Sequence, residues 1–154
     1  MNTEDQFGRI VPPGRLWDAP TWLISLLAAD SHRLVVGEIG TAERADYSVL
    51  AGLAELGPIS QSALGRRLAM DRSDVSGVLD RLEADGLVAR SPDPAHGSRK
   101  LSQLTEEGRA RLDRLDAGVR AAQHSLVGAL GPDESARLLD LLQRLVEHHR
   151  GLRR

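Results

Sequence analysis

The sequence predicts a mainly α-helical chain that carries one small β-hairpin. Three observations between Gln61 and Thr105 support this prediction. Apolar residues recur with the period of an α-helix on both sides of a joint only two residues long, Ala69-Met70. Prolines and a glycine then exclude helix from 91 to 98. The short segments that flank this turn are typical of two paired strands.

The helix that follows the joint is expected to have two different faces. Asp71 is its predicted N-cap and Asp74 its third residue, so both carboxylates can accept hydrogen bonds from free N–H groups. Gly86 is expected to end the helix in a left-handed conformation, with Leu87 folding back on it. The predicted buried side chains recur at i, i+3, i+4 and i+7: Val75, Val78, Leu79 and Leu82. The opposite face carries small polar residues with an arginine at each end: Ser73, Ser76, Gly77, Asp80, Arg72 and Arg81.

That polar face has two interpretations. A helix face of small polar residues edged by arginine can enter a DNA major groove about 12 Å wide. The solvated outer face of an ordinary amphipathic helix would look the same. The preceding helix favours the first interpretation, because Ser60 can cap a helix that runs to about Leu68. The joint after it is short enough only for a helix-turn-helix.

The segment after Gly86 is expected to form a wing. Leu87 to Arg90 and Lys100 to Leu104 are the predicted strands, and Ile59 can add a minimal third. With the two helices they predict a winged helix-turn-helix over residues 43–105. The basic side chains of the hairpin, which could reach phosphate or the minor groove, are Arg90, Arg99 and Lys100.

Four short motifs occur along this stretch in a fixed order. They are Asp80-Arg81-Leu82-Glu83, Gly86-Leu87-Val88, Asp93-Pro94, and Leu104-Thr105 followed by Gly108. The order resembles the central signature of the MarR family of bacterial transcriptional regulators. By motif the similarity runs from about Arg44 to Leu115, and by length and element order it covers the whole chain. One departure lies in the wing tip: the family often has an aspartate and then an arginine, whereas this chain has His96-Gly97-Ser98 before its basic residues.

The ends of the chain are expected to form a helical dimerisation region, over residues 15–40 and 106–154. Residues 1–14 are polar and proline-containing and are predicted to be a loose arm. A helix that begins between Arg15 and Thr21 and ends near Ile39 is apolar on more than one side, which suggests burial against a second subunit. Further helices are expected over Arg44–Leu56, from Thr105, and from Pro132 to the basic end of the chain. Because the apolar stripes on the first and the last two helices have too little partner surface within one chain, we infer a homodimer.

Composition narrows the function classes. The formal net charge is −2, so any DNA affinity must come from a local arrangement of charge. The chain has no cysteine, which fits a reducing cytoplasm and excludes disulfides and thiolate metal sites. No apolar run approaches the length of a membrane span, and the polar start does not resemble a signal peptide. We therefore expect a cytoplasmic protein with no membrane partner.

The sequence predicts neither an enzyme nor a metal protein. It has no nucleophile elbow, no P-loop, no zinc-protease motif and no dinucleotide fingerprint. Glu83 and Asp85 point apart on a helix and make a poor acid–base pair. The histidines lack the spacing of metal ligands: His32, His96, His124, His148 and His149. No cofactor is expected.

The resemblance implies a site for a small molecule. Many MarR-like proteins lose DNA affinity when a small, often aromatic and anionic effector binds between the dimerisation helices and the winged domain. The residues that could line such a crevice here are Arg15, Trp17, Trp22, His32 and Tyr47. The alternative is that the tryptophans pack in the dimer core or against the N-terminal arm.

These observations predict a homodimeric, sequence-specific DNA-binding regulator, a repressor that a small-molecule effector releases. Two recognition helices would read the half-sites of a pseudo-palindromic double-stranded operator about 34 Å apart. The predicted DNA-binding residues are Ser60, Gln61, Arg72, Ser73, Ser76, Gly77, Arg81, Arg90, Arg99 and Lys100. The alternative is a winged-helix dimer that has lost operator binding and acts as a protein-interaction or ligand-binding adaptor.

Overall fold

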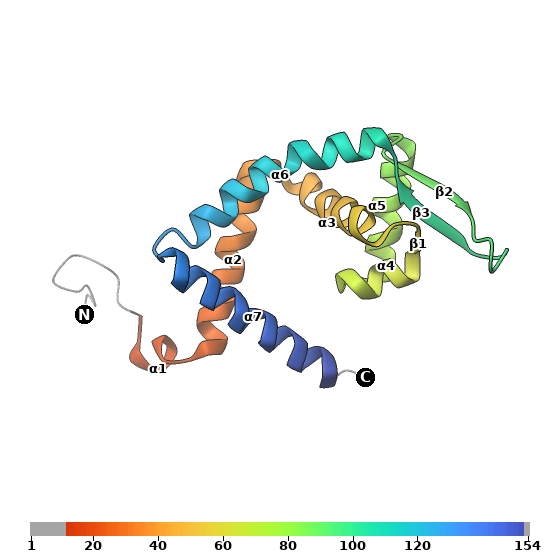
Figure 1. Ribbon diagram of the computed structural model, residues 1–154. Helices are drawn as coiled ribbons and strands as arrows, with labels where there is room; N and C mark the ends of the chain where they lie inside the picture. Colours follow the sequence, from red (N-terminus) through yellow and green to blue (C-terminus); the bar gives the residue numbers. More distant parts are fainter. Residues whose placement is uncertain (1–11, 153–154) are drawn as a thin grey trace.

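The computed structural model describes residues 12–152, so most of the predicted N-terminal arm and the last two residues lie outside the described chain. The described part is mostly helical, as predicted, with one small sheet at the end of the molecule opposite α1 (Figure 1). The elements in chain order are α1 Gly14–Trp17, α2 Pro20–Ile39, α3 Thr41–Leu56, β1 Ile59–Ser60, α4 Gln61–Leu68, α5 Arg72–Ala84, β2 Val88–Pro92, β3 Lys100–Leu104, α6 Glu106–Leu126 and α7 Pro132–Leu152.

The first predicted helix is α2, which begins at Pro20 and ends at Ile39, within the predicted limits. A separate short helix that the sequence patterns did not predict, α1, precedes it and starts at Gly14, inside the stretch assigned to the arm. α3 starts at Thr41 rather than Arg44, because Gly40 turns the chain with φ 91° and serves as the N-cap. Propensity patterns place such boundaries poorly, since a single glycine conformation decides them.

The sheet is antiparallel, with strand order β1-β3-β2. In its register Val88 lies opposite Leu104, Ser91 opposite Leu101, and Ile59 opposite Ser102. The predicted hairpin and the minimal third strand at Ile59 are therefore confirmed. The wing projects from the helices, with β1 connecting it to α4 (Figure 1).

The core of the winged domain lies between α3, α4 and α5. All four residues of the predicted α5 stripe are buried, and Val75, Leu79 and Leu82 are fully inaccessible to solvent. The side chains that meet them are Val49, Leu50, Leu53, Leu64, Val88, Leu112 and Leu115. Each such side chain removed from water contributes about 1.5–3 kcal/mol, so this cluster fixes which face of α5 stays outside.

The ends of α5 confirm one capping prediction and correct another. Gly86 has φ 72°, and its N–H donates to Glu83 O at 3.0 Å while the Leu87 N–H donates to Leu82 O at 2.9 Å. This is the predicted left-handed C-terminal cap. Asp71 occupies the N-cap position, but its side chain makes no capping hydrogen bond, so the prediction that its carboxylate satisfies a free N–H was wrong. The turn before it is closed instead by Ala69 in the left-handed conformation, with φ 54°.

A close backbone contact joins the wing to α6. The Thr105 hydroxyl donates to Gly86 O at 2.8 Å and accepts from the Gly108 N–H at 3.0 Å. A Cβ built on Gly108 would lie 2.0 Å from Leu87 O. The Leu104-Thr105 and Gly108 motif is therefore a packing requirement of this junction, since any side chain at 108 would separate α6 from the hairpin.

The outer helices divide into a packed pair and a projecting one. α6 packs along α2 and against α3, and its apolar stripe at Leu112, Leu115, Val119 and Ala122 is buried within the chain. The expectation that this helix lacks partner surface was wrong, because α2 covers it. α7 packs extensively against no other described element and projects from the end of α6 (Figure 1). Within residues 12–152 no helix is long and apolar enough to cross a membrane.

Replacing Gly108 with alanine should destabilise the protein by about 2 kcal/mol or more, because backbone atoms on both sides must move to admit the methyl group. Gly77→Ala on α5 is the matched control, since its new Cβ meets no atom within 4 Å. It should raise the unfolding free energy by about 0.5–1 kcal/mol through helix propensity. Urea denaturation of both variants checks the prediction, and equal effects of the two substitutions would contradict it.

Candidate nucleic-acid interface

The outward face of α5 is polar and free of bulky apolar residues. Ser73, Gly77 and Asp80 are exposed on it, and Ser76 is half-buried at its edge. The buried stripe on the other side holds this face in a fixed direction. The helix is therefore presented as the sequence predicted, and a surface hollow lies on each of its two flanks.

The hollow on the wing side has a volume of about 570 Å³ and is rich in positive charge. Its lining contains five basic side chains and no acidic one: Arg66, Arg72, Arg90, Arg99 and Lys100. Ser60 and Gln61, at the start of α4, complete one wall, and the Gln61 amide donates to Arg72 O at 3.4 Å. A second hollow of about 620 Å³ is lined by Gln61, Arg72, Ser73 and Ser76. The structure thus gathers eight of the ten predicted DNA-binding residues around the start of α5.

Arg90 is held differently from the other basic residues. Its guanidinium lies 2.7 Å from the Asp80 carboxylate and 3.1 Å from that of Glu83, and its side chain is only 15% exposed. Nη2 of the same group is buried and has no hydrogen-bond partner in the described chain. Arg90 therefore fastens β2 to the exposed side of α5 through Asp80 and Glu83.

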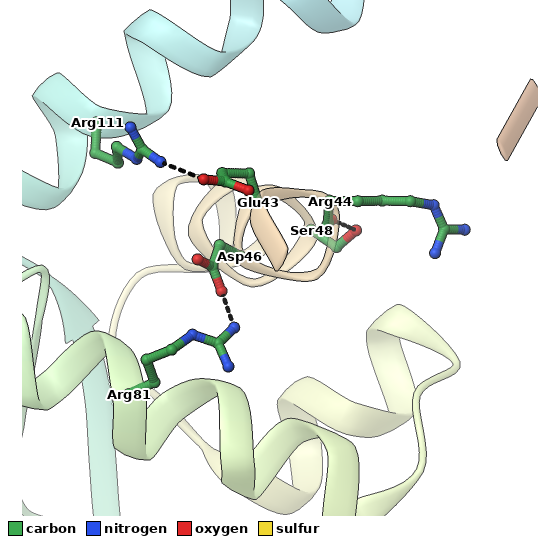
Figure 2. A network of polar contacts seen from close by, with 6 residues as sticks. All are labelled: Glu43, Arg44, Asp46, Ser48, Arg81 and Arg111. Carbon is green, nitrogen blue, oxygen red and sulfur yellow. Dashed lines mark hydrogen bonds and ion pairs between the residues drawn. The ribbon is translucent and has the colours of Figure 1, made fainter. Parts of the chain in front are cut away.

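Arg81 is also paired. Its guanidinium donates to the Asp46 carboxylate of α3, and nearby Glu43 of the same helix pairs with Arg111 of α6 at 3.4 Å (Figure 2). Each of these partly exposed pairs contributes about 1 kcal/mol or less. Together they connect the first turns of α3 to both α5 and α6.

The wing tip is ordered by its own backbone. The Asp93 N–H donates to Arg99 O at 2.9 Å, and the Arg99 N–H donates to His96 O at 2.8 Å. The Asp93 carboxylate also accepts from the Ala95 N–H at 2.9 Å. The Asp93 carboxylate and N–H are thus both used within the turn, while Arg99 and Lys100 remain exposed next to the wing tip.

The sequence interpretation missed Arg66. This residue is exposed on α4 and lines the same hollow as Arg72 and Arg99. The signal was available, because Ser62 and Arg66 recur at i and i+4 on the face of α4 opposite its buried residues.

The predicted effector residues are not brought together within one protomer. Arg15 and Trp17 lie exposed on α1, and the Trp17 ring meets Trp22 edge-on with centroids 6.5 Å apart. His32 is exposed farther along α2, about 15 Å from Trp22 by helical rise. Tyr47 lies on α3, beyond the far end of α2. The hollow between α2 and α6 is lined by other residues, Leu27, Asp30, Arg33, Leu34, Ser125 and Leu126.

Tyr47 has a perturbed hydroxyl. Partial burial, followed by a hydrogen bond to the Asp116 carboxylate of α6, raises the pKa of Tyr47 above its usual value. Both causes favour the neutral phenol. Tyr47 therefore connects α3 to α6 as a hydrogen-bond donor.

No metal centre is formed by the residues that the structure describes: none of their His, Asp and Glu side chains gather in groups of three or more that could hold an ion.

The Tyr47 hydroxyl can be titrated directly, because this is the only tyrosine of the chain. Its phenolate absorbance should rise with a midpoint above the usual pKa of about 10. Since the folded-state pKa is the higher one, the contribution to stability is present below the usual value and is lost as the pH rises through the raised one. Asp116→Ala should lower the midpoint, and Asp113→Ala, on the same helix, should not. A midpoint at the usual value in the wild type would contradict the hydrogen bond.

Known proteins resemble this chain in sequence and in structure. The family model described as MarR family matches residues 43–97. The transcriptional repressor NicR of Pseudomonas putida is 33% identical over 101 residues, which cover 66% of this chain and 64% of NicR. The match thus spans slightly less than two thirds of that relative.

Two solved structures match this chain over almost the whole of their own length. A probable transcriptional regulator from Pseudomonas aeruginosa is 34% identical, with a TM-score of 0.77 over 85% of this chain and 99% of that one. BpsR of Bordetella bronchiseptica, whose structure concerns the regulation of its DNA binding by 6-hydroxynicotinic acid, is 27% identical, with a TM-score of 0.78 over 88% and 98% of the two chains. With the matching family model and the winged helix-turn-helix geometry, these similarities establish that the chain belongs to the MarR family of transcriptional regulators.

Proposed function

We propose that the protein is a homodimeric repressor that binds a pseudo-palindromic double-stranded DNA site and is released from it by a small molecule. The observation that carries this proposal is the wing-side hollow, where five basic side chains and no acidic one lie next to the polar face of α5. Backbone phosphates are the ligands that such a hollow suits, and a face of serines and glycine suits the edges of bases.

The local arrangement outweighs the overall charge. The formal net charge is −2, yet the lining of this hollow carries five basic side chains, of which only Arg90 is paired with carboxylates in the described chain. Ser73, Ser76, Gly77 and Arg72 would then face base edges. Arg99 and Lys100 would hold phosphates or enter the minor groove. Arg81 and Arg90 would act mainly by fixing α5 and the wing, because carboxylates already neutralise them.

The dimer is supported by apolar surface that the single chain leaves uncovered. α7 carries exposed Leu139, Leu142, Leu145 and Val146 on one side, and α2 carries exposed Ile24, Leu26 and Leu27. Helices with such faces need a partner. We assign dimerisation to residues 15–40 and 106–154, and DNA binding to residues 43–105.

The effector step rests on family likeness and on the position of the aromatic residues. The DNA binding of BpsR is regulated by 6-hydroxynicotinic acid, an aromatic acid. Here Arg15, Trp17, Trp22, His32 and Tyr47 would line a crevice only if a second copy supplies part of it. Such a ligand lowers DNA affinity by the difference between its affinities for the free and DNA-bound conformations.

Substitutions on the two parts of the interface should separate affinity from specificity. Arg99→Ala should weaken binding to all duplexes alike, since it removes a phosphate contact. Ser76→Asp should abolish the preference for the operator, because it places a negative charge at the base edges. Fluorescence anisotropy with DNA from upstream of the protein's own gene, against a scrambled duplex, measures both effects.

The control is Arg114→Ala, an exposed arginine of α6 away from the wing. The wild type should bind the upstream duplex more tightly than the scrambled one, and its affinity for both duplexes should rise as the salt concentration is lowered. Equal affinities of the wild type, Arg99→Ala and Ser76→Asp for both duplexes would instead favour the adaptor function.

The dimer can be tested on α7. Replacing Leu142 and Leu145 together with aspartate should shift the protein to monomer, because two charges enter the apolar face that we assign to the interface. The protomer core should survive, since α7 packs extensively against no other described element. Gln143→Asp, on the same helix, is the control. Sedimentation equilibrium measures the change, and an unaltered dimer in the double variant would refute the assignment.

A further inference from the structure

α5 has a second flank, on the side away from the wing, which three of the predicted DNA-binding residues also line. On this side, away from the wing, a hollow of about 630 Å³ separates α5 from the first turn of α3. It is lined on α5 by Ser73, Gly77 and Arg81 among others, and on α3 by Thr41, Ala42, Arg44 and Ala45. The exposed polar face of α5 therefore lies between the wing-side hollow and this hollow beside α3.

Arg44 is the one unpaired arginine in the described lining of this hollow between α5 and α3. The other arginine in its lining, Arg81, is held by Asp46. Arg44 is exposed and forms an ion pair with no carboxylate in residues 12–152. Its side chain points away from the network that ties α3 to α5 and α6, whereas neighbouring Glu43 and Asp46 point into it (Figure 2).

The width of the DNA major groove determines what the first turn of α3 would lie next to in a complex. An α-helix with its side chains is about 10–12 Å across, which nearly fills a major groove about 12 Å wide. The phosphates of both strands then stand beside the two flanks of the helix. Because the wing and α4 occupy one flank, the first turn of α3 faces the strand on the other side.

We propose that Arg44 binds a DNA backbone phosphate on the strand opposite the wing, so that each half-site is held from both sides of α5. This proposal rests on the DNA-binding function proposed above. The carboxylates of Asp71 and Asp74 also line this hollow, and they offset the two arginines. Arg44 is therefore the group that makes a phosphate tolerable there, and Asp74 is the group that opposes it.

The test compares the salt dependence of DNA binding in the wild type and in Arg44→Ala. Arg44→Ala should lower the affinity for the operator and for the scrambled duplex alike, by about tenfold. The two losses should be equal because a phosphate contact carries no information about the bases. The slope of log affinity against log salt should become shallower by about 0.9, the value for one phosphate on duplex DNA. Arg44→Lys should retain most of the slope. Asp74→Asn should bind more tightly than the wild type.

The outcomes distinguish this proposal from the function on which it rests. A wild type that binds DNA, together with an Arg44→Ala variant of unchanged affinity and salt slope, would overturn the role of Arg44 and leave the regulator function intact. Lost affinity with an unchanged slope would also overturn it, because a structural role does not alter the number of phosphates neutralised. A wild type that binds no duplex at low salt would overturn both. Arg114→Ala is the control for the loss of one exposed arginine.

Discussion

The burial of the apolar stripe of α5 is the constraint on which the candidate DNA interface depends. Val75, Leu79 and Leu82 are inaccessible to solvent and are clamped between α3 and α4. A rotation of the helix would expose its four buried apolar side chains to water, at a free-energy cost of several kcal/mol, about 1.5–3 kcal/mol for each. The polar face is therefore presented in one direction.

The wing depends on this helix in turn. Gly86 and Leu87 close the end of α5, Thr105 hydrogen-bonds to Gly86 O, and Gly108 lets α6 approach Leu87 O. Arg90 then joins β2 to the acidic residues on the last turns of α5. Because the same few residues end the recognition helix, begin the hairpin and start α6, the distance between wing and helix is fixed by covalent and hydrogen-bond geometry.

The first turns of α3 have a separate role between the two halves of the chain. Asp46 pairs with α5, and Glu43 pairs with α6 (Figure 2). Tyr47 also hydrogen-bonds to Asp116 of α6. A movement of α6 relative to the winged domain must alter these contacts. In a dimer assembled through the outer helices, α3 would therefore transmit a change at the subunit interface to the recognition helix, through groups whose individual energies are small.

The sequence by itself determined the local features of this protein: the α5 stripe, the left-handed Gly86, the Ser60 and Thr105 caps, and the hairpin. These follow from residues within a few positions of one another, so periodicity and capping chemistry suffice to predict them. The tertiary structure alone decided which arginines are free. Arg81 meets Asp46 across 35 positions, and Arg111 meets Glu43 across 68. It likewise decided that Arg66 joins the wing-side hollow and that Arg44 stands on the other flank. A charge pattern shows where the cations are in the chain, but only the packing of distant segments shows which of them already have a partner.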